Sequence, residues 1–314
     1  MLLKKGDLLG SYEIIDLLSS SGGMSQVFLG RSLANKELEV AIKVHEVDDE
    51  NSDVYENLLH EEVEILKSLR HPGIVHIYPL YVDGRFVYTA RAHNHPGQPW
   101  YFAMEYLGRN NTLADYRQEI KICSVEWGIE LFYQLLIIVD YLHRLGYAHY
   151  DLKPHNIFLR QSPHNRLRPM PVLADFGTII KAHRGVNQPV ASLRYSAPEV
   201  IYALRGDIKF SNVQPQKTDI WALGAIFFEI LTGEMLINVT GGKDAITTSI
   251  IKGEFDKIAA KRDQKHPALD SLDTVLSRMV NSDPEKRPGT GTLIRAVEER
   301  ILSICPPRIP AASS

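Results

Sequence analysis

The hydrophobic pattern of this 314-residue chain changes its period once. Residues 12–106 carry short runs rich in Val, Ile, Tyr and Phe, which are typical of β-strands. After Leu107, apolar residues recur every three to four positions, as they do in amphipathic helices. A β-rich part therefore joins a helical part near residues 105–110. We expect two domains, or two lobes that share a cleft, and the length excludes a mini-protein.

The pattern predicts the elements in order. Strands are expected at 12–18, 26–31, 39–44, 74–82, 86–90 and 100–104. One helix interrupts them between Asp53 and Leu69, and His71-Pro72-Gly73 ends it. Further helices are expected at 112–117, 124–145, 218–231, 268–280 and 290–302, with Ser124 and Thr218 as N-caps.

Composition limits the partners and the compartment. With 44% hydrophobic and 23% charged residues, the chain lies in the globular range. A net charge of -3 gives no basic surface for nucleic acid, so we expect no nucleic-acid partner. Cys123 and Cys305 make no disulfide framework, and no Cys/His quartet predicts zinc. A reducing, cytoplasmic location is the expectation.

Two apolar runs require a choice between membrane and core. Residues 131–139 and 220–231 are shorter than the ~18 residues of a membrane span, and Gln134 and Glu229 interrupt them. Buried core helices are the favoured interpretation, and we expect no membrane segment. The N-terminus also lacks the apolar stretch of a signal peptide.

Three segments are expected to be surface loops: 91–99, 161–171 and 205–216. His93 and His95 could be read as metal ligands, but no acid or cysteine lies at a supporting spacing. We therefore favour a solvated loop there, and we expect the tail 306–314 to be frayed.

Six motifs in order carry the chemistry. They are Val40-Ala41-Ile42-Lys43, His149-Tyr150-Asp151-Leu152-Lys153-Pro154-His155-Asn156, Asp175-Phe176-Gly177, Ala197-Pro198-Glu199, Asp219-Ile220-Trp221-Ala222-Leu223-Gly224 and Asp283-Pro284-Glu285-Lys286-Arg287-Pro288. Together they resemble the catalytic core of eukaryotic-type Ser/Thr protein kinases. The Gly22-Gly23-Met24 segment also resembles bacterial members of that family.

The resemblance implies an α+β, bilobal fold that covers about residues 12–302. It places a β-rich N-lobe with one main helix at 1–107, a helical C-lobe at 108–305 and a tail at 306–314. It also implies ATP and Mg²⁺, or Mn²⁺ in its place, as cofactors, and a protein substrate with a Ser or Thr acceptor. The oligomeric state stays open.

Phosphoryl transfer is catalysed mainly by positioning and by cations, and the resemblance assigns those roles to particular residues. Asp151 would accept the proton of the substrate hydroxyl. Lys153 would place a cation beside the γ-phosphate, and a Lys here is similar to Ser/Thr kinases. Asn156 and Asp175 would hold the metal ions, because hard cations prefer oxygen ligands.

Lys43 lies on an expected strand and would reach the α and β phosphates. The family register gives Glu62, on the helix expected between Asp53 and Leu69, as its partner. Glu61 and Glu64 are competitors, and a lone helix Glu is more often solvated.

The adenine site is expected around the strand that ends near residue 105. The resemblance makes Met104 the gatekeeper, with the Glu105 carbonyl and the Leu107 amide and carbonyl meeting the base. Val27 and Ala41 would cover one face of the base and Phe158 the other. These three apolar residues would also suit an ordinary core.

The glycine-rich loop departs from the family pattern. Aligned back from Val27, it reads Ser20-Ser21-Gly22-Gly23-Met24-Ser25-Gln26-Val27, so Ser20 and Ser25 stand where the motif has glycines. Serine still offers its backbone N–H but not the conformational freedom of glycine. We expect Ser20, Gly22, Gly23 and Ser25 to handle nucleotide more weakly or slowly.

Tyr150 stands where most members have an Arg that pairs with a phosphate on the activation segment. That segment, 178–196, has only Thr178, Ser192, Tyr195 and Ser196 as acceptors, and Ser192 is expected to face Asp151 and Lys153. Activity without activation-segment phosphorylation is the prediction. His155 replaces an acid that often reads a basic residue, so strong Arg selection is not expected.

Other matching residues are expected to be structural. Glu199 with Arg287 resembles the buried ion pair of the C-lobe, and Asp219 the residue that fastens the catalytic loop. Leu66, Phe176 and His149 would stack between the lobes. Two other functions stay open: a pseudokinase that binds nucleotide and partners without turnover, and a small-molecule phosphotransferase.

Overall fold

The structure is a computed structural model that describes residues 3–20, 25–45, 52–119, 124–162, 165–182, 192–262 and 266–299. The chain forms two compact units, Met1–Asn111 and Thr112–Ser314. The sequence places the boundary slightly earlier, after residue 107.

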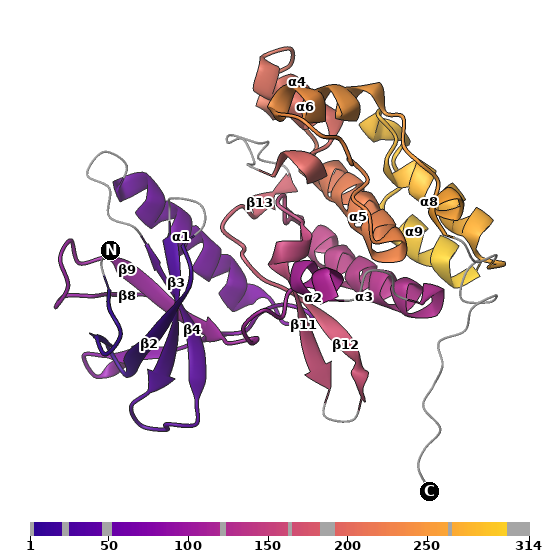
Figure 1. The fold of residues 1–314 in the computed structure, drawn as a ribbon. Helices are drawn as coiled ribbons and strands as arrows, with labels where there is room; N and C mark the ends of the chain where they lie inside the picture. The colour runs from indigo at the N-terminus through magenta and orange to yellow at the C-terminus, as the bar shows by residue number, and fades with distance from the viewer. Residues whose placement is uncertain are drawn as a thin grey trace, which may run out of the picture. The chain divides into compact units, whose positions relative to one another are not determined.

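The first unit is built on an antiparallel sheet. Its described residues form seven strands in the order β1-β2-β3-β4-β9-β5, with β8 also paired to β9 (Figure 1). The strands are β1 (Leu8–Leu9), β2 (Tyr12–Ser19), β3 (Ser25–Ser32), β4 (Glu39–His45), β5 (Ile77–Tyr78), β8 (Ala90–Arg91) and β9 (Trp100–Glu105). Ile14, Phe28, Ile42 and Ala103 are buried in its core, as the β-branched and aromatic runs predict.

The helix α1 (Ser52–Ser68) packs against β4, β5 and β9. It buries Leu59, Val63 and Leu66, the apolar stripe that predicts it. The single strand expected at 74–82 is wrong, because the chain divides there into β5 and a separate hairpin of β6 (Leu80–Val82) and β7 (Arg85–Val87). Pro79 lacks the N–H that a continuous ladder needs, and Gly84 turns the hairpin at φ 78°.

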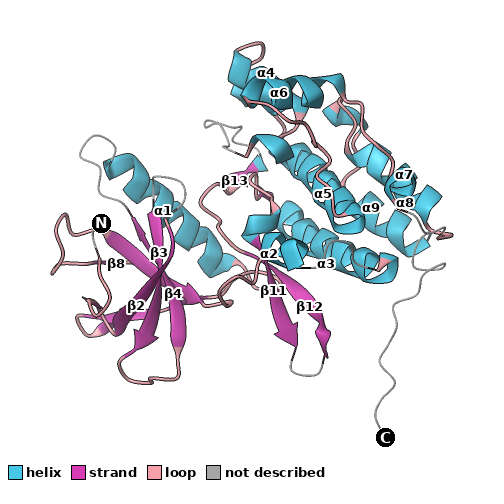
Figure 2. Ribbon diagram, viewed as in Figure 1, coloured by secondary structure: helices cyan, strands magenta, loops and turns pink. Residues whose placement is uncertain are grey.

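The second unit is mainly helical (Figure 2). Its helices are α2 (Leu113–Glu119), α3 (Val125–Arg144), α4 (Pro198–Arg205), α5 (Pro215–Thr232), α6 (Lys243–Lys252), α7 (Ile258–Lys261), α8 (Leu269–Met279) and α9 (Thr290–Val297). Two antiparallel pairs accompany them, β10 (Tyr147–Ala148) with β13 (Ile180–Lys181) and β11 (Ile157–Ser162) with β12 (Asn165–Leu173).

The helices α3 and α5 form the centre of this unit. Ser124 caps α3, since its Oγ accepts a hydrogen bond from the Trp127 amide at 3.2 Å. The predicted Thr218 cap is wrong, because α5 begins one turn earlier at Pro215, a residue that suits the first helical position. The apolar runs 131–139 and 220–231 lie inside these two helices. None of the described helices is long and apolar enough to span a membrane.

The surface loop expected at 161–171 is a third error, because most of that segment belongs to the β11–β12 hairpin. Pro171 pairs with Leu159 there. Both strands of a two-stranded hairpin are edge strands, and edge strands are where a sheet tolerates proline. The helices α4 and α6 were not expected. Their signals are Pro198 at the first turn and the left-handed caps Gly206 and Gly253.

The other expected loops agree better with the structure. Residues 92–99 are irregular, and the His95 ring nitrogen Nε2 lies 3.1 Å from the Leu8 carbonyl oxygen. Within the loop expected at 205–216, residues 206–214 join α4 to α5 and contain only a short 3-10 turn, Phe210–Asn212. The tail 306–314 lies outside the described residues.

Candidate active site

In the first unit, Lys43 and Glu62 form a buried ion pair. The Lys43 ammonium donates to both Glu62 carboxylate oxygens, at 2.9 and 2.8 Å, and the two residues are 8% and 4% exposed. Lys43 comes from β4 and Glu62 from the buried face of α1. The competitor Glu64 is exposed and pairs with Lys67 at 2.7 Å, and Glu61 is also exposed. The structure therefore brings Lys43 to Glu62.

The predicted adenine residues of this unit lie on neighbouring strands. Ala41 pairs with Met104 across β4 and β9, and Val27 of β3 pairs with Lys43. The Glu105 amide donates to the His76 carbonyl at 2.7 Å. The Leu107 carbonyl accepts from the Asn111 side chain at 2.7 Å, which leaves its second lone pair for another donor.

The glycine-rich segment is described only at its ends. Ser20 follows β2, and Ser25 begins β3 opposite His45. Gly22 and Gly23 lie outside the described residues. The predicted role of this segment therefore stays a prediction.

In the second unit, Asp151 is the centre of a polar cluster. One carboxylate oxygen, Oδ2, accepts from the Lys153 ammonium at 2.6 Å and from the Asn156 amide at 3.3 Å. Lys153 also donates to Ser192 Oγ at 3.1 Å, the contact expected from sequence. The other oxygen, Asp151 Oδ1, is buried and has no hydrogen-bond partner in the described part of the chain.

Asn156 and Asp175 are the candidate metal ligands. The Asn156 amide nitrogen donates to Asp151 groups, so the amide oxygen is the atom left for a cation. Asp175 is exposed and has φ 58°, a conformation that costs a non-glycine residue about 1–3 kcal/mol. The Ala174 amide donates to the Asn156 carbonyl at 3.0 Å and so joins the two ligand segments. Carboxylate and amide oxygens fit a hard divalent cation.

Asp219 of α5 holds the loop that carries these residues, as predicted. Its carboxylate accepts from the His149 amide at 2.9 Å and from the Tyr150 amide at 2.8 Å. No sequence motif indicates His143, whose Nε2 lies 2.9 Å from Asp219 Oδ2. Its place on α3 was predictable, but no short motif joins a residue to one 76 positions away.

Two further structural predictions concern packing. Arg287 donates to both Glu199 oxygens, at 2.6 and 2.7 Å, which confirms the buried pair. The ring centroids of His149 and Phe176 lie 5.0 Å apart in the second unit. Leu66 belongs to the first unit, so its part in the predicted stack stays a prediction. Phe158, expected below the adenine, lies half-buried on β11 opposite Val172.

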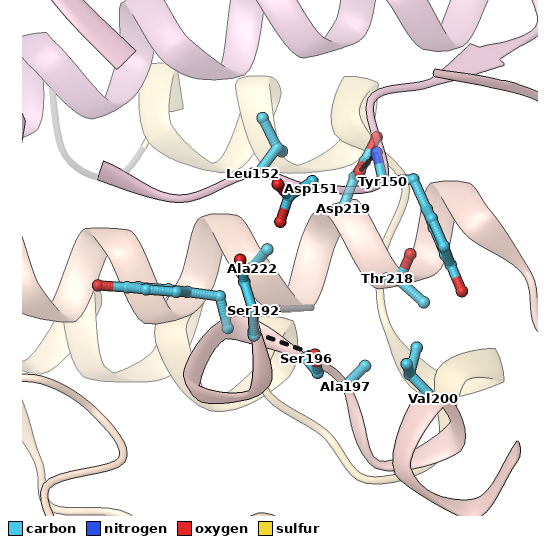
Figure 3. A pocket seen from close by; sticks show the side chains of 11 residues that line it. Tyr150, Asp151, Leu152, Ser192, Ser196, Ala197, Val200, Thr218, Asp219 and Ala222 are labelled. Atoms are coloured by element: carbon cyan, nitrogen blue, oxygen red, sulfur yellow. Dashed lines mark hydrogen bonds between the residues drawn. The ribbon is translucent and has the colours of Figure 1, made fainter. Parts of the chain in front are cut away.

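Tyr150 and Asp151 line a small pocket together with residues of α4, α5 and the segment before α4 (Figure 3). Tyr150 is 7% exposed and has φ 67°. Burial, followed by the nearby carboxylates of Glu199 and Asp219, raises the pKa of the Tyr150 hydroxyl well above its usual value. The side chain that replaces the family's Arg is therefore neutral and inside the protein.

Comparison with known proteins agrees with this geometry. The protein kinase domain family matches residues 15–297. Serine/threonine-protein kinase ULK1 of Homo sapiens is 31% identical over 72% of this chain and 20% of its own length. PrkC of Bacillus subtilis is 25% identical over 88% of this chain, and PknB of Mycobacterium leprae is 29% identical over 95%. The chain covers 38% and 44% of those two relatives, so it spans less than half of each of the three.

The chain therefore belongs to the protein kinase family, as a domain of the eukaryotic serine/threonine type. This confirms the resemblance and the bilobal α+β fold class.

Proposed function

We propose that the chain is an ATP-dependent protein kinase that transfers the γ-phosphate of ATP to Ser or Thr hydroxyls. The Asp151 carboxylate is the observation that supports this most directly. Lys153 and Asn156 hold one of its oxygens, and the other is buried with no partner among the described residues. A carboxylate fixed in this way can orient a substrate hydroxyl and accept its proton.

The cations of this chain complete the proposed step. Lys153, held by Asp151 and Ser192, would stabilise the phosphoryl oxygens as they develop charge. Lys43, held by Glu62, would bind the α and β phosphates. Each ammonium is fixed by hydrogen bonds before the nucleotide binds, which lowers the cost of positioning it.

Asn156 and Asp175 would hold a divalent cation, Mg²⁺ or Mn²⁺, since their oxygens suit such ions. When bound, the ion would supply neutralisation of the β and γ phosphate charge. The protein contributes the position of the two ligands, through the hydrogen bond from Ala174 to Asn156.

We further propose that activity does not require phosphorylation of the activation segment. Its four acceptor hydroxyls already make internal hydrogen bonds. Thr178 donates to the His149 carbonyl, Ser192 accepts from Lys153, Tyr195 donates to Glu229 and Ser196 donates to the Ser192 carbonyl. The neutral Tyr150 also offers no cation to a phosphate.

This second proposal is tested by phosphatase treatment combined with mass spectrometry. Equal kinase activity before and after treatment is the expected result. A large loss of activity, with the removed phosphate mapped to residues 178–196, would contradict it.

His155 supports a proposal about the substrate. It is exposed and carries no carboxylate that could pair with a basic substrate residue. We propose that the protein does not select Arg strongly just upstream of the acceptor. A peptide array would show such selection directly if it exists.

The catalytic proposal is tested with γ-labelled ATP, Mg²⁺ and a Ser/Thr-containing protein substrate. Asp151→Asn and Asp175→Asn each remove one carboxylate charge and should abolish labelling. Asp207→Asn, the same substitution at an exposed loop position, should leave labelling unchanged. Equal labelling in all four proteins would falsify the proposal.

The altered glycine-rich segment and Tyr150 favour a second candidate, a pseudokinase scaffold. That function predicts that ATP raises the melting temperature while no phosphate is transferred. A third outcome, labelling of a small molecule but of no protein, would indicate a small-molecule phosphotransferase.

A further inference from the structure

Residues 192–196 form a short turn beside the catalytic loop. Ser192 of this turn lines the same pocket as Asp151 (Figure 3). The Ser192 hydroxyl accepts a hydrogen bond from the Lys153 ammonium at 3.1 Å, and the same ammonium donates to Asp151 at 2.6 Å. The position of the turn therefore affects where the Lys153 charge lies.

Arg194 is the charged side chain at the middle of the turn, and it reaches a distant part of the chain. One guanidinium nitrogen, Nη1, donates to the Ile237 carbonyl at 2.5 Å, and Nη2 donates to the Val239 carbonyl at 3.3 Å. Both carbonyls belong to residues 233–242, which join α5 to α6 outside any helix or strand. Ile237 is only 1% exposed, so Arg194 attaches the turn to a part of the chain that is packed in the core.

The chemistry of this attachment requires an arginine. A planar guanidinium can donate to two carbonyls in one orientation, whereas a lysine ammonium is a point charge on a flexible stem. Hydrogen bonds from a charged donor are also about twice as strong as neutral ones. Among the residues that the structure describes, no carboxylate pairs with Arg194, and its acceptors are neutral carbonyls. The attachment therefore needs neither an acidic partner nor a phosphate.

Two other side chains of the turn make hydrogen bonds elsewhere. The Tyr195 hydroxyl donates to Glu229 of α5 at 2.7 Å, and Ser196 Oγ donates to the Ser192 carbonyl at 3.1 Å (Figure 3). These bonds fasten the turn to α5 and to itself. Arg194 adds an attachment to the segment between α5 and α6.

We propose that Arg194 is a positioning residue that holds Ser192 where its hydroxyl fixes Lys153. Lys153 in turn stays beside Asp151, the carboxylate that accepts the substrate proton in the proposed function. The inference rests on that function and deepens it, since the attachment holds the activation segment without a phosphate.

The test combines Arg194→Met, which removes the guanidinium, with Ser192→Ala and the double variant. Arg205→Met is the matched control, because Arg205 is an exposed arginine of α4 that donates to Thr247 of α6 at 3.0 Å and makes no hydrogen bond to the turn. Melting temperatures establish that each variant folds. If Arg194→Met does not fold, Arg194→Lys replaces it, since one ammonium cannot reproduce the fork of two donors.

Two properties of each variant are measured. Hydrogen exchange reports on the amides of Tyr195 and Ser196, which donate to the Ser192 and Leu193 carbonyls inside the turn. Steady-state kinetics with γ-labelled ATP and a Ser/Thr-containing protein substrate give kcat and the KM for ATP.

Arg194→Met should lower kcat about three- to tenfold, the size of one net hydrogen bond, and leave the KM for ATP unchanged. The double variant should lose no more than Ser192→Ala alone, because Arg194 acts through Ser192. Exchange of the two amides should rise in Arg194→Met. The control Arg205→Met should keep the kcat and the exchange of the wild type.

An unchanged kcat, losses that multiply in the double variant, or unchanged exchange of the two amides would overturn the inference. If the wild-type protein transfers no phosphate, the proposed function fails by itself. The exchange of Arg194→Met and of its control then still decides whether Arg194 holds the turn.

Discussion

At the scale of single residues, the position of one carboxylate decides whether Lys43 is held. Glu62 is buried on α1 and contacts the Lys43 ammonium with both oxygens, whereas Glu64 lies on the exposed side of the same helix. The two glutamates are close in sequence but differ in their environment. This difference gives a controlled test of the Lys43 role.

Glu62→Gln should lower kcat/KM roughly 100-fold, since it removes the charge that fixes the Lys43 ammonium in position. Glu64→Gln should change kcat/KM little and stability by no more than about 0.5 kcal/mol, because it alters only an exposed pair. Steady-state kinetics of the two variants measures the difference. Similar activity in both would show that Lys43 needs no partner.

Tyr101 gives a prediction about pH. Burial, helped by nearby Tyr12, raises the pKa of Tyr101 to about 12, from an ordinary value of 10.0. The folded state therefore favours the neutral phenol. Its contribution to the free energy of unfolding is fully present below pH 10 and is lost as pH rises toward 12.

Thermal unfolding between pH 9 and 12 checks this. The melting temperature of the wild type should fall across that range, and Tyr101→Phe should make the fall shallower. Tyr81→Phe should leave the slope unchanged, because Tyr81 is exposed. Identical slopes in all three proteins would refute the assignment to Tyr101.

At the scale of elements, α5 is the support of the catalytic loop. Nearly all its side chains are buried, and Asp219 reaches from it to the loop amides. Its close contact with α8 depends on Gly224. A Cβ atom at this position would lie 2.8 Å from a Val280 methyl carbon and 3.0 Å from the Met279 Cβ.

Gly224→Ala should therefore destabilise the protein by about 1–3 kcal/mol through overpacking, despite the higher helix propensity of Ala. Gly242→Ala is the control, since nothing lies within 4 Å of its added Cβ, and it should cost at most about 1 kcal/mol, because Gly242 is the N-cap of α6 and glycine suits that position better than alanine. Urea unfolding of both variants measures the difference. Equal stabilities would mean that α5 and α8 can move apart at no cost.

At the scale of the whole molecule, a buried ion pair joins parts of the chain that are far apart in sequence. Glu199 of α4 and Arg287, which precedes α9, are 88 positions apart and almost fully buried. The Arg287 side chain also donates to the Asn281 and Lys217 carbonyls. This network ties α4 and the start of α5 to the C-terminal helices.

Arg287→Met should cost about 3–5 kcal/mol of unfolding free energy, because it leaves Glu199 buried without its partner. The double variant Glu199→Leu with Arg287→Met should recover part of that loss. Chemical denaturation of the two single variants and the double variant gives the coupling energy. Strictly additive losses would show that the two residues act independently.

The sequence determined the local elements and the chemistry that they carry. Periodicity predicts α1 and α3, and the Ser124 cap, because these depend on contacts within a few residues. The family motifs predict the protein kinase fold and name Asp151, Asn156 and Asp175 in advance. The predictions at 74–82 and 161–171 are wrong because both segments contain proline, and the pairing of the strands decides where a sheet accommodates a proline.

Only the tertiary structure decided the contacts between distant residues. It selected Glu62 among three glutamates by burial, and it brought His143 to Asp219. It also placed the Tyr150 side chain in the lining of a small pocket, together with residues of α4 and α5. The physical reason is that burial and long-range hydrogen bonds depend on how helices and strands pack, and no local pattern of residues specifies them.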